Sequence, residues 1–129
     1  PSMSQLQKQA YRAADYVLLP TMMDVDSYSG VGTVLSEVRA ASEEYKQAIQ
    51  ILGSIPTRFD NRTIQDQKGL EYIQTLYGDI VMTPLRSLVA WKESRTSGES
   101  IFTYSGGNGA MHDAMNFVNE IEGRLRNGQ

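Results

Sequence analysis

The segment from residue 31 to residue 52 constrains the fold more than any other stretch of the sequence. Its apolar residues recur at spacings of three and four: Val31, Val34, Leu35, Val38, Ala41, Tyr45, Ala48, Ile49 and Leu52. A helix with about 3.6 residues per turn places residues at these spacings on one face. Because such a helix is marginal in water by itself, its apolar face needs partners. We therefore expect a helix over residues 31–53 that packs against other helices.

Three further segments, residues 4–19, 62–93 and 110–126, show the same helical spacing of apolar residues. The first ends at Pro20, which disfavours a helical conformation in the residue before it. Pro84 lies inside the longest segment. Since proline removes a backbone hydrogen bond, we expect a kink near residues 80–84, with a broken helix as the alternative.

These four segments predict an all-α fold, an up-down-up-down four-helix bundle whose third helix is kinked at Pro84. A chain of 129 residues fits a single domain, here a helical bundle over residues 1–129. No segment alternates between apolar and polar residues for long enough to predict a strand.

The composition argues against several classes of protein. The absence of cysteine excludes disulfides and thiol chemistry. No apolar run approaches the roughly 20 residues that span a bilayer, so we do not expect an integral membrane protein. The 12 basic residues are distributed among 15 acidic ones without a basic cluster, so we expect no binding to nucleic acid.

The residues that resemble metal ligands do not complete a known pattern. Asp24 and Asp26 resemble the start of a calcium-binding loop, but Leu35 occupies the position of the closing Glu. A Glu-x-x-His pair, as in di-metal bundles, is excluded because Gly109 stands three residues before His112, the single histidine. We predict no metal site, and weak binding of a divalent ion near Asp24 and Asp26 stays open.

Phosphate-binding and catalytic patterns are equally incomplete. The glycine-rich residues 106–109 precede a predicted helix, but no Lys-Ser or Lys-Thr follows as in a Walker loop. The carboxylate pairs Glu43/Glu44 and Glu120/Glu122 lie on predicted exposed faces, so we interpret them as solvated surface residues and not as a catalytic pair. The sequence therefore predicts no catalytic residue and no cofactor.

Aromatic residues outside the apolar faces are the remaining candidates for a functional surface. The polar loop 94–109 is long for a compact domain and contains an apolar insert at residues 101–104. Aromatic and arginine side chains are enriched at the centres of protein interfaces. The predicted partner-binding residues are Tyr11, Tyr72, Arg95, Ile101, Phe102 and Tyr104.

In helix number, length and lack of catalytic residues, the sequence resembles the small extrinsic four-helix subunits of photosystem II. That resemblance implies a soluble, cofactor-free protein on the lumenal face of a membrane-embedded complex, in the thylakoid lumen. It is a resemblance of layout and includes no shared motif.

The leading hypothesis is therefore a non-catalytic protein, not an enzyme, that docks as an extrinsic or assembly subunit on a larger protein complex. The first alternative is a carrier of a small ligand or pigment, with a site between helices near Pro84, Met82, Met111 and Met115. The second is an enzyme that uses a carboxylate-bound metal. Compartment, partner and oligomeric state are not determined by the sequence.

Overall fold

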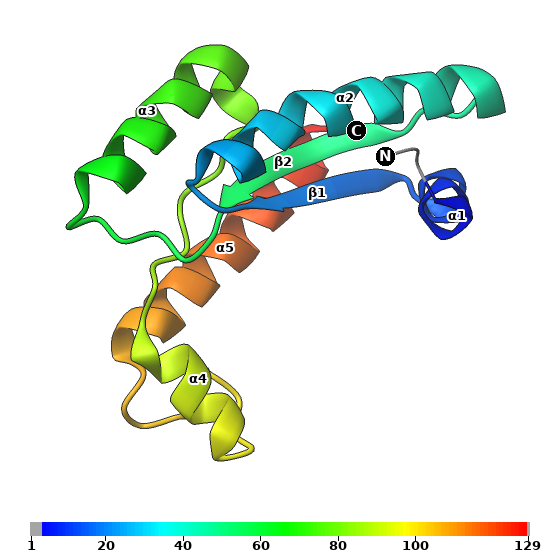
Figure 1. Cartoon of the computed structure of the whole chain (residues 1–129). Coiled ribbons are helices and arrows are strands. Elements are labelled where there is room, and N and C mark those ends of the chain that lie inside the picture. The colour runs from blue at the N-terminus through cyan, green and yellow to red at the C-terminus, as the bar shows by residue number, and fades with distance from the viewer. Residues whose placement is uncertain (1–3, 129) are drawn as a thin grey trace.

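The computed structural model describes residues 4–128 and has a mixed α/β fold (Figure 1). The predicted all-α four-helix bundle is therefore wrong. In chain order the elements are α1 (Gln5–Ala13), β1 (Tyr16–Thr21), α2 (Val25–Tyr45), β2 (Gln50–Pro56), α3 (Ile64–Tyr77), the 3-10 helix η1 (Gly78–Ile80), α4 (Val89–Thr96) and α5 (Asn108–Asn127).

β1 and β2 form a parallel pair, and α2 makes the crossover between them. Tyr16 lies opposite Gln50 and Thr21 opposite Pro56, with one irregularity in the register. Parallel strands require such a long connection, because a tight turn joins only antiparallel neighbours. Five consecutive residues of β2 are buried, so both of its faces are covered.

Residues 81–87 run beside β2 as a third, irregular parallel segment. The backbone N–H of Met82 donates to the carbonyl of Ser54 at 2.8 Å, and that of Leu85 donates to the carbonyl of Pro56, also at 2.8 Å. The order across the sheet is therefore β1, β2 and then this segment.

The predicted helix over residues 4–19 contains two elements, because the chain becomes extended at Ala14 (φ −88°, ψ 143°). α1 ends at Ala13, and β1 follows from Tyr16. A short continuous apolar run such as residues 17–19 is compatible with a buried parallel strand and with a buried helix segment. The spacing of its apolar residues does not show which of the two forms.

The helix predicted over residues 31–53 begins and ends earlier. Asp24 caps α2 by accepting the backbone N–H of Ser27 at 2.8 Å, which satisfies an N–H group that has no partner within the helix. The helix ends at Tyr45 because Lys46 adopts a left-handed conformation (φ 51°, ψ 45°).

Gly53, the last residue of the predicted helix, lies in the middle of β2. A Cβ atom at this position would collide with Sδ and Cγ of Met82. The sequence places glycine here because a neighbouring side chain approaches the backbone closely, and not because a turn is needed.

The prediction of a single kinked helix over residues 62–93 is also wrong. The alternative of a broken helix agrees better with the structure, in which α3 and α4 are separate helices. α3 ends at Gly78, whose positive φ of 57° is readily adopted only by glycine. Pro84 lies in the parallel segment 81–87 and does not kink a helix. α4 then begins at Val89.

The core has two groups of buried side chains. One joins α1, α2 and the residue before β2 through Tyr11, Val38, Ala41 and Ile49, and the other contains Met23, Phe59 and Ile73. α5 includes the range 110–126 expected for the last helix, and it packs on β2 (Figure 1). Within residues 4–128, no helix is long and apolar enough to cross a membrane.

Candidate functional site

A cleft opens where β2 ends and the chain passes to Thr57 and Arg58. In open parallel α/β sheets, ligands bind beyond the carboxyl ends of the strands. Here that edge is formed by the end of β2 and by the segment 81–87, whose residues Leu85 to Val89 line the cleft. Because the cleft lies at this edge of the sheet, it is the first candidate for a ligand-binding site.

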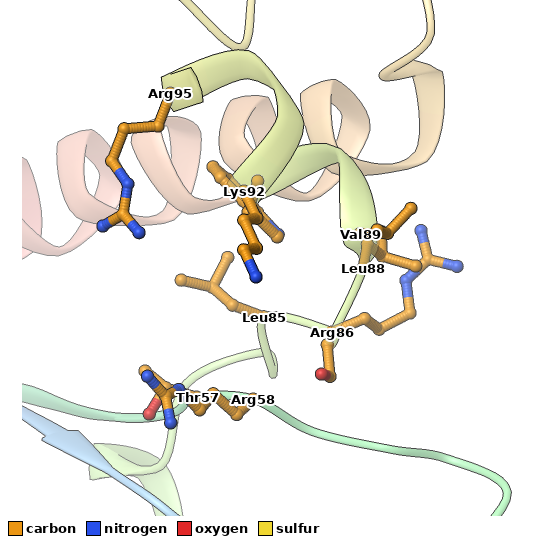
Figure 2. Close-up of a pocket in the computed structure, with 10 residues that line it drawn as sticks. Thr57, Arg58, Leu85, Arg86, Leu88, Val89, Lys92 and Arg95 are labelled. Atoms are coloured by element: carbon orange, nitrogen blue, oxygen red, sulfur yellow. The ribbon is translucent and has the colours of Figure 1, made fainter. Parts of the chain in front are cut away.

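The cleft has a volume of about 680 Å³, and four of its ten lining residues are cationic. Figure 2 shows that the side chains of Lys92 and Arg95 extend from α4 toward the side of the cleft on which Thr57 and Arg58 lie. The remaining lining residues are Leu85, Arg86, Ser87, Leu88, Val89 and Trp91. No carboxylate within residues 4–128 forms an ion pair with Arg58, Lys92 or Arg95. These three side chains therefore line the cleft without a carboxylate at ion-pairing distance within the described residues.

Arg58 holds its position through an uncommon backbone conformation. Its φ is 51°, in the left-handed region that residues with a Cβ adopt at a cost of about 1–2 kcal/mol. Such conformations concentrate at ligand-binding sites, because the surrounding structure has to maintain them. The conformation turns the chain at the end of β2, where Arg58 borders the cleft.

Arg86 connects the cleft to α5. Its backbone N–H donates to Asp113 at 3.0 Å, and its guanidinium donates to both carboxylate oxygens, with Nη2 to Oδ1 at 2.9 Å. Burial raises the pKa of the Asp113 carboxyl, but the Arg86 hydrogen bonds and charge outweigh burial, so the pKa lies below its ordinary value. The ionised pair fixes the start of α5 beside the cleft.

A smaller hollow of about 300 Å³ adjoins the cleft and shares Arg86 to Val89 with it. Its other wall is the loop Phe59–Arg62. Asp60 in this loop accepts hydrogen bonds from the Arg62 guanidinium, which hold the pKa of Asp60 below its ordinary value. The two hollows share one wall, and we call them together the groove; the smaller hollow contains the carboxylate of Asp60, which is paired with Arg62.

This combination of groups suits a ligand with both an anionic and an apolar part. Unpaired Lys and Arg side chains attract phosphate or carboxylate groups. Trp91 and Leu88 offer an apolar surface, and Thr57 and Ser87 supply hydroxyl groups. Within residues 4–128, no group of three or more metal-ligating side chains comes together.

The predicted partner-binding residues do not form one surface. Tyr11 is 8% exposed, and its hydroxyl donates to Glu37. Tyr72 is 52% exposed and packs near Tyr28. They belong to α1 and α3, which lie at opposite ends of the sheet (Figure 1).

The other predicted partner-binding residues lie in or next to the loop 94–109, but their side chains have different environments. Ile101 and Tyr104 pack against Gly107, and Phe102 is 44% exposed. Arg95 is exposed and lines the cleft. Partner binding by these residues stays a prediction.

Other side chains considered from the sequence have structural roles. Glu120, expected on an exposed face, accepts the backbone N–H of Thr83 and pairs with Arg124 at 3.1 Å. Met82 is buried, but Met111 and Met115 are 37% and 48% exposed and do not line the cleft.

Sequence reasoning missed Arg58, Arg86 and Lys92. Two short apolar runs, residues 16–20 and 51–56, flank one long helix and are the signal of a strand–helix–strand unit. Had this unit been recognised, the residues after the second run would have been candidates, because they follow the carboxyl end of a strand.

No known family model matches the sequence. An uncharacterised protein of Mycobacterium tuberculosis is 26% identical over 106 residues, which are 81% of this chain and 33% of that protein. The chromosome-partitioning ATPase Soj of Thermus thermophilus is 23% identical over 127 residues, which are 98% of this chain and 51% of Soj. The chain thus spans about a third to a half of the length of these relatives.

A solved structure of a Cyanothece McdA variant in complex with ATP superimposes with a TM-score of 0.77, at 15% sequence identity. The match covers 97% of this chain and 48% of McdA. The chain has the fold of about half of McdA. The structure of McdA without nucleotide gives the same result, with a TM-score of 0.71 at 16% identity.

These findings overturn the resemblance to photosystem II subunits and the functional hypothesis built on it. The chain shares the fold of about half of McdA, a variant of which was solved with ATP, and one relative is an ATPase. The expectations of a non-catalytic extrinsic subunit, of no enzymatic activity and of the thylakoid lumen were wrong because they depended on an all-α layout that the chain does not have.

Proposed function

We propose that this chain is part of an ATP-binding protein of the partitioning-ATPase type and that its cationic cleft holds part of the nucleotide. The observation that carries the proposal is the position of the cleft, at the carboxyl edge of parallel segments in a fold shared with an ATP-bound McdA. The sequence relationship to Soj, a chromosome-partitioning ATPase, supports the same class.

The residues of the cleft fit a nucleoside triphosphate. Arg58, Lys92 and Arg95 supply positive charge for phosphate oxygens, and Trp91 and Leu88 offer an apolar surface for a base. When bound, ATP would supply the phosphoryl group whose transfer to water is the reaction of an ATPase. Within this proposal the chain's own residues bind and orient the nucleotide.

The phosphate-binding loop of such a protein is not among residues 1–129, because no Walker pattern occurs in them. Since the relatives are two to three times as long, we assign that loop to the part of the protein that this chain does not include. The proposed contribution of this chain is therefore one wall of the nucleotide site.

Titration of the full-length protein with a fluorescent ATP analogue tests the proposal. The double variant Lys92→Ala/Arg95→Ala removes two charges from the cleft. Exposed charge contacts contribute up to about 1 kcal/mol each, so we expect the Kd to rise about tenfold. Arg39→Ala, which removes an exposed charge from α2 outside the cleft, is the matched control. Absence of binding by the wild type, or equal affinities of double variant and control, overturns the proposal.

The predicted partner surface is a separate proposal. Phe102 and Tyr104 lie on the loop between α4 and α5, and Phe102 is 44% exposed. If a larger protein complex binds here, Phe102→Ala/Tyr104→Ala will weaken its capture without changing ATP affinity. Unchanged capture removes these two residues from the surface.

A further inference from the structure

The segment from residue 88 to residue 107, which contains α4, makes little contact with the rest of the fold. Within residues 4–128, α4 has no extensive packing contact with another helix or strand, whereas α5 packs on β2 and α2 packs on both strands. Figure 1 shows that α4 projects away from the sheet. We call residues 88–107 the flap and the remaining described residues the body.

The hydrogen bonds of the flap are made within the flap. The backbone N–H of Glu99 donates to the carbonyl of Ser94 at 2.9 Å, and that of Tyr104 donates to the carbonyl of Ser100 at 3.0 Å. Side-chain hydrogen bonds of the same segment also have both partners inside it. Within residues 4–128, no hydrogen bond or ion pair joins residues 88–106 to the body. A segment bonded in this way moves as one unit.

The flap is connected to the body at two places. The backbone N–H of Ser87 donates to the carbonyl of Phe59 at 2.8 Å, so the body extends to Ser87 on the first side. On the second side the body begins again at Asn108, the first residue of α5. The consecutive glycines 106 and 107 come directly before it, and glycine tolerates a wider range of backbone angles than other residues do.

Arg86 holds these two connections next to each other. Its guanidinium donates to Asp113 at 2.9 Å and to the carbonyl of Gly109 at 3.2 Å, so the residues before and after the flap are bonded to one another. Two connections that are fixed side by side define one axis about which the flap turns. Hinges of this kind consist of a few loop or element-terminal residues.

The cationic cleft lies between the flap and the body. Lys92 and Arg95 line it from the flap, and Thr57 and Arg58 line it from the body (Figure 2). A rotation of the flap therefore changes the width of the cleft. The three cationic side chains repel one another across the empty cleft, and an anion placed between them is attracted by all three.

We infer that the flap is hinged, that it is open in the ligand-free protein and that it closes on an anionic ligand, which brings Lys92 and Arg95 toward Arg58. The hinge and the charges are properties of this chain. That the anion is the triphosphate of ATP rests on the proposed function. Closure of a lid excludes water from a ligand and strengthens the electrostatic contacts inside the site.

Distances between pairs of spin labels in the full-length protein test the hinge. Ser97→Cys in the flap is paired with Gln65→Cys in α3, and the control pair joins Gln65→Cys to Asn119→Cys in α5; all three positions are exposed. Any cysteines elsewhere in the protein are replaced, and excess unlabelled protein removes distances between molecules. Without ligand, we expect the distance distribution of the flap pair to be about twofold wider than that of the control, because a hinged segment samples several orientations. Equal widths overturn the inference.

Addition of ligand to the same samples tests the closure. Saturating ATP is expected to shorten the mean distance of the flap pair and to narrow its distribution to the width of the control, whose mean distance stays the same. If ATP binds but leaves the flap distance unchanged, the inference is overturned and the proposed function stands. If ATP does not bind, the proposed function fails, and inorganic triphosphate, which has no base, decides the closure. A shorter flap distance with this probe supports the inference, and an unchanged distance overturns it.

Discussion

Removing the carboxylate of Asp113 tests how the cleft is held together. Asp113→Ala eliminates the acceptor for the backbone N–H of Arg86 at 3.0 Å and for its guanidinium at 2.9 Å. Hydrogen bonds to a charged group contribute about 1.5–3 kcal/mol. Arg86 is 39% exposed and keeps its bond to the carbonyl of Gly109, so water reaches part of the released charge. We therefore expect a loss of about 2 kcal/mol, less than the roughly 3–5 kcal/mol for a fully buried pair.

Urea unfolding followed by the fluorescence of Trp91 measures this loss. With a slope of about 2 kcal/mol per molar, the midpoint falls by about 1 M. Glu122→Ala is the control, because its pair with Arg126 is exposed on both sides (57% and 78%) and is worth well under 1 kcal/mol. A midpoint for Asp113→Ala equal to that of the control contradicts the assignment of Arg86 and Asp113 as the link between the cleft and α5.

The pH dependence gives a second check on the same pair. The pKa of Asp113 is lowered in the folded protein, so the pair stabilises the fold fully above the unfolded carboxyl pKa of about 3.9. This stability is lost as the pH falls through the lower, folded-state pKa. The difference between wild type and Asp113→Ala is therefore expected at pH 7 and to shrink toward pH 3. A difference that stays constant with pH refutes an ionised pair.

Two further predictions concern backbone positions. Gly53→Ala forces a Cβ against Met82 and is expected to lower the free energy of unfolding by about 1–3 kcal/mol. Gly30→Ala, in open space within α2, is expected to raise it by about 0.5–1 kcal/mol. Thermal unfolding measures both changes, and equal shifts in the two variants contradict the close contact between Gly53 and Met82. Arg58→Gly and Lys46→Gly both replace a residue with φ of 51°, so each is expected to change stability by less than about 1 kcal/mol. Arg58→Gly alone is expected to raise the Kd for ATP, about fivefold, and an equal effect of Lys46→Gly argues against a role of Arg58 in the cleft.

The apolar periodicity of the sequence locates helix faces well and strands poorly. Val31, Val38 and Ala41, predicted on the apolar face of the helix, are buried in α2. The same periodicity was extended through Ile49 and Leu52, which lie at the start of the second strand region. A buried strand in a parallel sheet is apolar on both faces, so it lacks the alternation that identifies a strand at a surface.

The cleft was not predictable from local patterns for a different reason. Arg58 and Arg86 come from separate segments, and Lys92 comes from α4. They face one cleft because residues 81–87 pair with β2 over long range. In the sequence these basic residues are dispersed among acidic ones, so their common location depends on the topology of the sheet.

Photolabelling of the full-length protein with an azido-ATP, followed by mass spectrometry of the labelled peptides, tests the central claim most directly. The account predicts that label is incorporated in residues 57–62 or 85–95, the two walls of the groove, and that excess unlabelled ATP suppresses it. Labelling that excess ATP suppresses, but that lies entirely outside these two segments, contradicts the assignment of the cleft to the nucleotide.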